Sequence, residues 1–240
     1  MVRFFVSPEE LAGETILLTG ENAQHAKVLR LKEGEQALLC DGAGQEALCR
    51  LVSAADWCWQ VLERRASQTE AAVRVSVYMA FPKGDKLEHV IQKATELGAY
   101  EIVVFPSTRC VSRPDDKAIR KKLDRWQKIA VSAAEQSGRG RIPQVVTLSS
   151  YAQALVRAAQ ADKALLFYEN ERATTLKMAL AGDYRTVSLL TGPEGGLEEK
   201  EVAQAMEAGL QVCTLGSRIL RCETAPLCAL SAVMFDAGEF

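Results

Sequence analysis

Two stretches in the C-terminal third decide the fold: LLTGPEGGLEEKE (189–201) and LGSRILRCETA (215–225). In the first, an apolar strand pattern leads into three glycines and then into a helix pattern that begins with Glu198, Glu199 and Glu201. Glycines let backbone groups approach a ligand, and the carboxyl ends of strands in an α/β sheet are where ligands bind. The loop matches neither the dinucleotide nor the Walker pattern, and acids at the helix start disfavour a phosphate. We therefore expect a site for a neutral or cationic ligand, with a plain tight turn as the alternative.

The second stretch marks the start of the last helix. Thr224 is of a type that caps helices, and Pro226 falls in the first turn, where its missing N–H costs nothing, so a helix over 225–235 is predicted. Three charged residues precede it: Arg218, Arg221 and Glu223. Alone they are typical of an ion-pair cluster, but next to the glycine stretch they indicate a second part of one site.

The chain from residue 73 onward alternates strand and helix patterns. Strands are predicted over 73–80, 101–105, 163–168 and 186–190. Helices are predicted over 83–98 and 115–137, with a helix-compatible stretch over 173–181. Such alternation is typical of a parallel α/β sheet.

The N-terminal part has a different rhythm. Short strand patterns separated by turns fill 36–62, preceded by a short helix or turn within 25–35. This indicates a small antiparallel barrel. The polar segment 64–72 is the candidate boundary, which predicts domains over 1–70 and 73–240.

Charge is distributed unevenly along the 240 residues, although the net charge is only −2. Residues 71–150 carry 14 Lys and Arg against 8 Asp and Glu, and nearly all the excess lies between Arg109 and Arg141. A polyanion such as RNA fits this segment, and a solvated helix face is the alternative.

Several classes of protein are disfavoured by composition. No apolar run approaches the roughly 20 residues of a membrane-spanning helix, and the N-terminal stretch does not resemble a signal peptide. Seven cysteines without a C-x-x-C pair predict reduced thiols and a cytoplasmic protein. With only two histidines, neither a metal site nor a Ser-His-Asp triad is expected.

Five blocks carry a resemblance to a known family. They are HAKVLRLKEGE (25–35), KGDKLEHVIQKATELGAYEIVVFPSTRCV (83–111), AVSAAEQSGRGRIP (130–143), LTGPEGGLEEKE (190–201) and LGSRILRCETA (215–225). Together they resemble the SPOUT methyltransferases and, among these, the bacterial enzymes that methylate N3 of a uridine in 16S ribosomal RNA. The resemblance implies a PUA-like β-barrel over 1–70 and, over 73–240, a SPOUT α/β domain with a deep trefoil knot. It also implies S-adenosylmethionine as cofactor, ribosomal RNA or the small ribosomal subunit as partner, and a homodimer.

The resemblance also assigns residues to roles. The cofactor-binding residues are Thr191, Gly192, Pro193, Glu194, Gly195, Gly196, Leu215, Gly216, Ile219, Leu220, Arg221, Thr224 and Ala225. The substrate-binding residues are Lys27, Arg30, Arg109, Arg113, Gln136 and Arg139. The N-terminal MVRFFV departs from the more basic start common in the family, which weakens an RNA role for Arg3.

Methyl transfer to N3 needs a held substrate and loss of the N3 proton. The candidate catalytic residues are Glu135, Arg139 and Arg221, with the two arginines stabilising the anionic base and a pKa of Glu135 lowered by its arginine neighbours. Three alternatives remain: an RNA-binding or ribosome-assembly factor without catalysis, a SPOUT enzyme that methylates a ribose 2′-hydroxyl, and a small-molecule enzyme acting on acidic metabolites.

Overall fold

The computed structural model describes residues 1–111 and 116–240, which fold as two compact units. Unit 1 comprises Met1–Glu70 together with Ala134–Ile142, and unit 2 comprises Ala71–Ala133 and Pro143–Phe240. The sequence-based boundary placed 134–142 in the second domain, whereas the structure packs this segment with the N-terminal residues.

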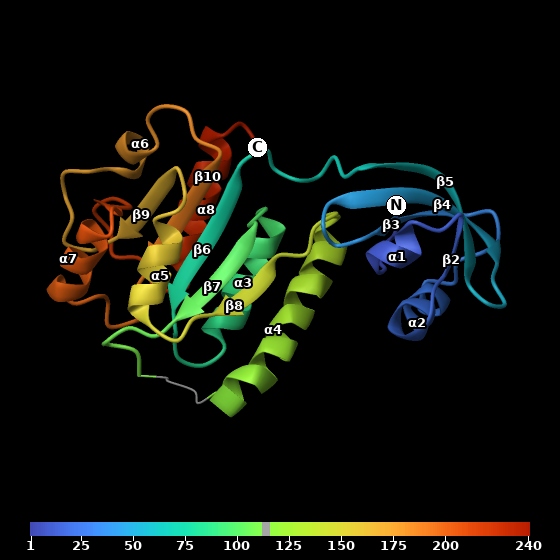
Figure 1. Ribbon diagram of the computed structural model, residues 1–240, viewed down its shortest axis with the longest axis horizontal. Helices are drawn as coiled ribbons and strands as arrows, with labels where there is room; N and C mark the ends of the chain where they lie inside the picture. The colour runs from blue at the N-terminus through green and yellow to red at the C-terminus, as the bar shows by residue number, and fades with distance from the viewer. Residues whose placement is uncertain (112–115) are drawn as a thin grey trace. The chain divides into compact units, whose positions relative to one another are not determined.

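Unit 1 is built on a five-stranded sheet with strand order β1-β3-β4-β5-β2 (Figure 1). The strands are β1 Arg3–Phe5, β2 Thr15–Leu17, β3 Gln36–Cys40, β4 Gln45–Ser53 and β5 Cys58–Ala66, and the helices are α1 Pro8–Leu11 and α2 Gly20–Val28. The antiparallel pairing expected within 36–62 is confirmed for β3, β4 and β5, whereas β1, which lies outside that stretch, pairs with β3 in parallel. The long connection through α1, β2 and α2 makes a parallel return possible.

All five strands of unit 1 contribute to one core. Phe4, Ile16, Leu39, Leu51 and Trp59 come from β1, β2, β3, β4 and β5 in turn, and each is at most 2% exposed. Alternating apolar residues place these side chains on one face of each strand. The sheet therefore curls around a single apolar interior.

Unit 2 contains a six-stranded, all-parallel sheet with strand order β11-β9-β10-β6-β7-β8. Its strands are β6 Arg74–Ala80, β7 Glu101–Phe105, β8 Gln144–Thr147, β9 Lys163–Phe167, β10 Thr186–Thr191 and β11 Gln211–Cys213. Its helices are α3 Lys86–Glu96, the body of α4 Asp116–Ser137, α5 Tyr151–Ala158, α6 Leu176–Ala179, α7 Glu199–Glu207 and α8 Thr224–Asp236.

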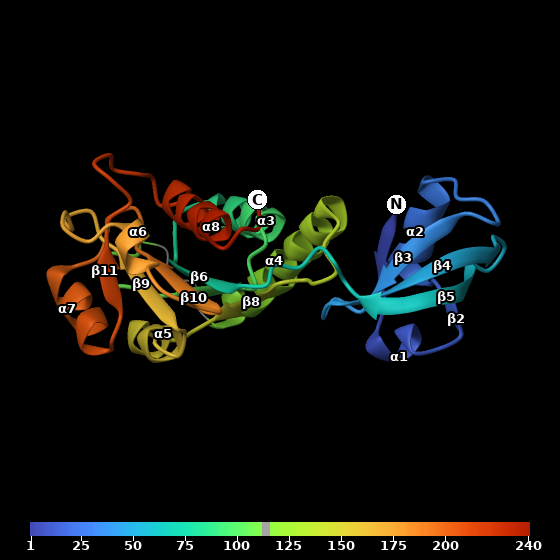
Figure 2. The ribbon, with the colours of Figure 1, turned by 90° about the horizontal axis from the view of Figure 1, so that it is seen from above.

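Helices cover both faces of this sheet: α3 and α8 lie on one face and α5 on the other (Figure 2). The apolar stripe of α3, which includes Leu87, Val90 and Ile91, is buried as its spacing predicts. Helix α6 is shorter than the stretch 173–181 that the sequence suggested. In the described part of the chain, no helix combines the length and the apolar character needed to cross a bilayer.

Candidate functional site

A cavity of about 470 Å³ opens at the carboxyl edge of the unit 2 sheet, where β9, β10 and β11 end. Its walls include twelve of the thirteen residues expected to bind the cofactor, which are Thr191 to Gly196, Leu215, Gly216, Ile219, Leu220, Arg221 and Ala225. Two loops from separate strand ends thus meet at one cavity. Thr224 is not among the lining residues; it is the first residue of α8, and Glu223 rather than Thr224 occupies the N-cap position.

Two glycines of the first loop are closely packed. A Cβ atom at Gly192 would lie 3.0 Å from the Leu197 side chain, and one at Gly196 would lie 2.5 Å from a carboxylate oxygen of Glu169. Gly196 also has φ +68°, a conformation that side chains rarely adopt. The loop consequently presents bare backbone to the cavity.

Arg109, assigned by resemblance to the substrate, lies against this glycine loop. Its guanidinium Nη1 donates to the Gly195 carbonyl at 3.0 Å, and its Nε is 3.8 Å from Glu198. Behind it, the buried Glu201 carboxylate accepts from the backbone N–H groups of Thr108 and Glu198. These contacts hold the glycine loop and the loop after β7 together.

The charged residues of the second loop do not pair with one another, as they would in the ion-pair cluster that was the alternative to a site. Arg218 and Arg221 are exposed on the cavity, and within the described residues neither has an ion-pair partner. Glu223 instead faces Lys86, whose Nζ is 3.5 Å away. Two uncommitted guanidinium groups are therefore available at the cavity.

Sequence reasoning missed part of the cavity wall. Tyr168, Glu169 and Arg172 follow β9, and Lys86 lies in the first turn of α3. The Glu169 carboxylate has no hydrogen-bond or ion-pair partner among residues 1–111 and 116–240. Strand β9 lies between β10 and β11, so its exit loop reaches the space between the two expected loops.

Unit 1 contains four of the six residues expected to contact the substrate. Lys27 and Arg30 at the end of α2 are exposed, as is Gln136 in the last turn of α4. Arg30 has φ +55° in the turn that ends α2, where Leu31 N–H donates back to the Ala26 carbonyl. Glycine is the usual residue at such a position, so an arginine there costs backbone strain.

Glu135 lies half-buried on α4, within electrostatic reach of His25 and Glu21 on α2. Burial raises the pKa of the Glu135 carboxyl above its ordinary value; His25 opposes this shift and Glu21 adds to it. The expectation of a lowered pKa is therefore wrong, because burial is the largest effect on this carboxyl.

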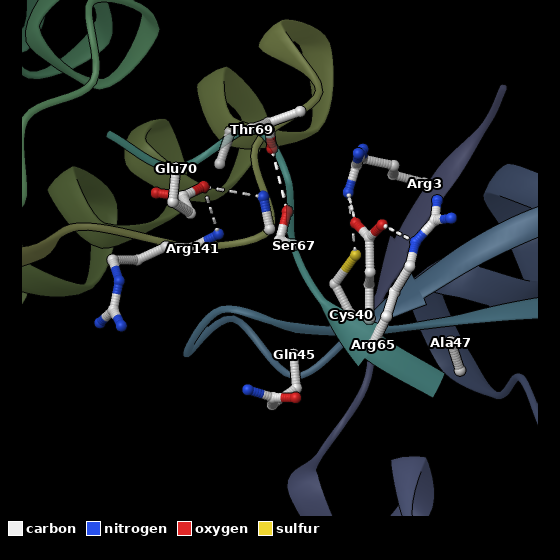
Figure 3. Close-up of polar contacts among 12 residues, drawn as sticks. Arg3, Cys40, Gln45, Ala47, Arg65, Ser67, Thr69, Glu70 and Arg141 are labelled. Carbon is white, nitrogen blue, oxygen red and sulfur yellow. Dashed lines mark hydrogen bonds and ion pairs between the residues drawn. The ribbon is translucent and has the colours of Figure 1, made fainter. Parts of the chain in front are cut away.

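Arg139 is buried and committed to a structural contact in unit 1. Its Nη2 donates to Glu70 at 2.6 Å, and its side chain is 5% exposed. The other Glu70 oxygen accepts from the backbone N–H groups of Gly140 at 2.9 Å and Arg141 at 3.0 Å (Figure 3). One carboxylate therefore anchors the segment that leaves α4.

Arg3 is likewise committed to the interior of unit 1. The buried carboxylate of Glu46 accepts from Arg3 Nη1 at 2.7 Å and from Arg65 Nε at 2.9 Å (Figure 3). Burial alone would raise the pKa of Glu46, but the two guanidinium groups outweigh it and hold that pKa below its usual range. Arg3 therefore serves the barrel core.

Arg113, expected to contact the substrate, lies outside the described residues. Within the described residues, no three His, Cys, Asp or Glu side chains gather in a way that could hold a metal ion. All seven cysteines are free thiols.

Comparisons with known proteins agree with this architecture. Residues 69–234 match the family model of the RNA methyltransferase domain, and residues 18–56 match that of the RNA methyltransferase PUA domain. The Bacillus subtilis ribosomal RNA small subunit methyltransferase E is 40% identical, over 98% of this chain and 97% of its own.

Two solved structures resemble the chain over nearly its full length. A ribosomal RNA small subunit methyltransferase E from Neisseria gonorrhoeae bound to S-adenosylmethionine is 35% identical with a TM-score of 0.86, covering 98% of this chain and 97% of that one. A Legionella pneumophila protein in complex with S-adenosylmethionine is 28% identical with a TM-score of 0.84 and the same coverage. These matches confirm the α/β fold with a PUA-like N-terminal domain, whereas the trefoil knot stays a prediction. The chain is an RNA methyltransferase that belongs to the ribosomal RNA small subunit methyltransferase E family.

Proposed function

We propose that this chain transfers a methyl group from S-adenosylmethionine to N3 of a uridine in 16S ribosomal RNA, acting in the cytoplasm as a homodimer. The observation that carries the proposal is the single cavity onto which both expected cofactor loops open, at the carboxyl edge of a parallel sheet. The bound cofactor in the Neisseria relative supports the same cofactor here.

The residues around the cavity fit S-adenosylmethionine. Its volume of about 470 Å³ is in the usual range for a small-molecule site. Leu215, Ile219 and Leu220 offer apolar surface to an adenosine, next to glycine backbone that offers N–H and C=O groups. Carboxylates and guanidinium groups on the same wall suit a ligand with both charges. When bound, the cofactor supplies an electrophilic methyl group on its sulfonium.

The acceptor nitrogen must lose its proton before it can attack. We assign proton removal to Glu135, because its raised pKa makes it a stronger base than an ordinary carboxylate. We assign stabilisation of the anionic uracil to Arg221, which is exposed on the cavity and has no ion-pair partner in the described part of the chain. Arg139, also a candidate for charge stabilisation, is assigned a positioning role because its charge is matched by Glu70.

RNA binding is assigned to the PUA-like domain over 1–70 and to the basic stretch between Arg109 and Arg141, which follows β7. Lys27, Arg30 and Gln136 present exposed side chains in unit 1. In the methyltransferase domain predicted over 73–240, Arg109 lies against the glycine loop. Arg113 is assigned to RNA from the sequence resemblance alone. A uridine N3 is hidden in a paired stem, so the target base has to leave its stack.

The test is incubation of the purified protein with methyl-labelled S-adenosylmethionine and small ribosomal subunits from cells that lack this modification, followed by nucleoside analysis. Label in 3-methyluridine is expected. Label in a 2′-O-methylated nucleoside would replace the base reaction by ribose methylation. Salt-sensitive RNA binding without label would replace the enzyme by an assembly factor.

A further inference from the structure

The two cofactor loops are not joined to each other by the fold. The first follows β10 and the second follows β11, and β9 lies between these strands in the sheet. No hydrogen bond runs directly between residues 192–197 and 214–222, all of which the structure describes. Their relative position must therefore depend on a third element.

Lys86, at the start of α3, contacts both loops. Its Nζ donates to Glu194 Oε1 of the first loop at 2.9 Å. The same Nζ lies 3.5 Å from Glu223 Oε2 and 3.8 Å from Cys222 Sγ, both at the end of the second loop. Lys83 N–H, in the loop that leads into α3, also donates to Glu194 Oε1 at 3.0 Å, so this carboxylate is held by two donors.

The charges around Lys86 explain why a cation is needed there. Glu194 and Glu223 both approach one ammonium group, so their carboxylates lie close together and repel each other without it. The hydrogen bond to Glu194 raises the pKa of Lys86. Burial works to raise the pKa of Glu194, but the donors Lys86 and Lys83 outweigh it, and the net shift is downward.

The exposure of Lys86 and Glu194 indicates that their contact affects the position of the loops more than the stability of the fold. The side chains of Lys86 and Glu194 are each 28% exposed, and ion pairs so accessible to water contribute little to folding stability. Lys86 also lines the cavity itself. A contact that adds little to stability, yet spans both walls of a binding site, acts mainly on the shape of that site.

We propose that Lys86 is a positioning residue that ties the two cofactor loops together and thereby sets the affinity for S-adenosylmethionine. The inference rests on the proposed cofactor and adds a residue outside both loops to its binding. The same tie serves S-adenosylhomocysteine, because the demethylated product shares the adenosine and amino-acid ends.

The test compares Lys86→Met, Lys86→Arg and Lys93→Met by calorimetric titration with both ligands. Lys93 is the matched control, since it lies on the same helix and pairs with Glu96 at 2.8 Å outside the cavity wall. Lys86→Met is expected to weaken both Kd values by about tenfold, near the low end for a lost hydrogen bond between charged groups. Its Tm is expected to stay within about 2 °C of the wild type. Lys86→Arg keeps the positive charge and is expected to bind both ligands with about the wild-type affinity.

A double-mutant cycle with Glu194→Gln measures the coupling between Lys86 and Glu194 in ligand binding. If Lys86 acts through Glu194, the double variant binds about as weakly as Lys86→Met alone. Wild-type affinity in Lys86→Met, or equal losses in Lys86→Met and Lys93→Met, would overturn the inference while leaving the proposed function intact. A wild-type protein that binds neither ligand would overturn both.

Discussion

Removal of the Glu70 carboxylate is the perturbation with the largest expected local effect. This group accepts three N–H donors from a segment about seventy residues away in the sequence: Arg139 Nη2, Gly140 N and Arg141 N. The side chains of Glu70 and Arg139 are 17% and 5% exposed, so water replaces few of these contacts when the carboxylate is lost. Glu70→Ala therefore removes the carboxylate that faces a buried guanidinium.

The size of the effect follows from burial. Loss of one member of a buried ion pair costs about 3–5 kcal/mol. In Glu70→Gln, the amide oxygen still accepts from the two backbone N–H groups, but the amide NH₂ faces another donor. We expect about 2–3 kcal/mol for this variant, as for the loss of one charged hydrogen bond.

Hydrogen exchange at the amides of Gly140 and Arg141 reports directly on local opening of the segment that Glu70 holds. If the segment opens locally, Glu70→Ala should accelerate their exchange by about a hundredfold or more, since each 1.4 kcal/mol is a factor of ten. Glu63→Gln on β5 is the matched control, because Glu63 is exposed and the substitution removes the same charge.

The opposite result would refute the reasoning. If exchange at these two amides is equal in Glu70→Ala and Glu63→Gln, the carboxylate does not hold the segment. If the segment opens in Glu70→Ala but methyl transfer proceeds at the wild-type rate, residues 134–142 have no role in presenting the substrate.

Three further predictions use other features of the structure. Arg30→Gly should raise the free energy of unfolding by about 0.5–1 kcal/mol, because it relieves the strain at φ +55°; urea unfolding measures this effect. The same variant should bind RNA more weakly and with a smaller salt dependence, which a filter-binding salt series measures. Gly196→Ala should weaken cofactor binding by about tenfold in a titration, because φ +68° costs an alanine about 1–2 kcal/mol and its Cβ would displace the Glu169 carboxylate; normal binding would show that the loop adapts at no cost. Glu135→Gln should slow single-turnover methylation by about a hundredfold or more if Glu135 is the base. The wild-type rate should fall as the pH drops through the raised pKa of Glu135. Because that pKa is higher in the folded than in the unfolded chain, the free energy of unfolding of the wild type should decline as the pH rises between the two pKa values. The Gln variant should show no such decline.

Local patterns were sufficient for the regular elements of unit 2. Strand β7 has the bounds that its apolar run predicted, and α3 buries the stripe that its spacing defined. Short strands such as β1, β2 and β8 were missed, because three or four residues are too few for a period to show. Such strands exist because a neighbouring strand supplies their hydrogen bonds.

Long-range contacts decided what the sequence could not show. From the sequence, residues 134–142 are predicted to belong to the second domain, since they continue a helix of that domain. Their membership of unit 1 depends on Glu70 and on a backbone bond from Ile142 N–H to the Gly42 carbonyl. A single carboxylate about seventy residues away carries no periodic signal.

The cavity residues after β9 could have been found by a topological argument. The sequence identified 163–168 as a strand of a parallel sheet, and all strands of such a sheet end at one edge. Its exit loop therefore belongs at the same edge as the two glycine-containing loops, whatever the strand order. The order then decides which exit loop matters: β9 lies between β10 and β11, so Glu169 and Arg172 line the cavity between the loops that these strands carry. A search for a ligand site should accordingly include the loops that follow the carboxyl ends of all parallel strands, and not only the loops with glycine motifs.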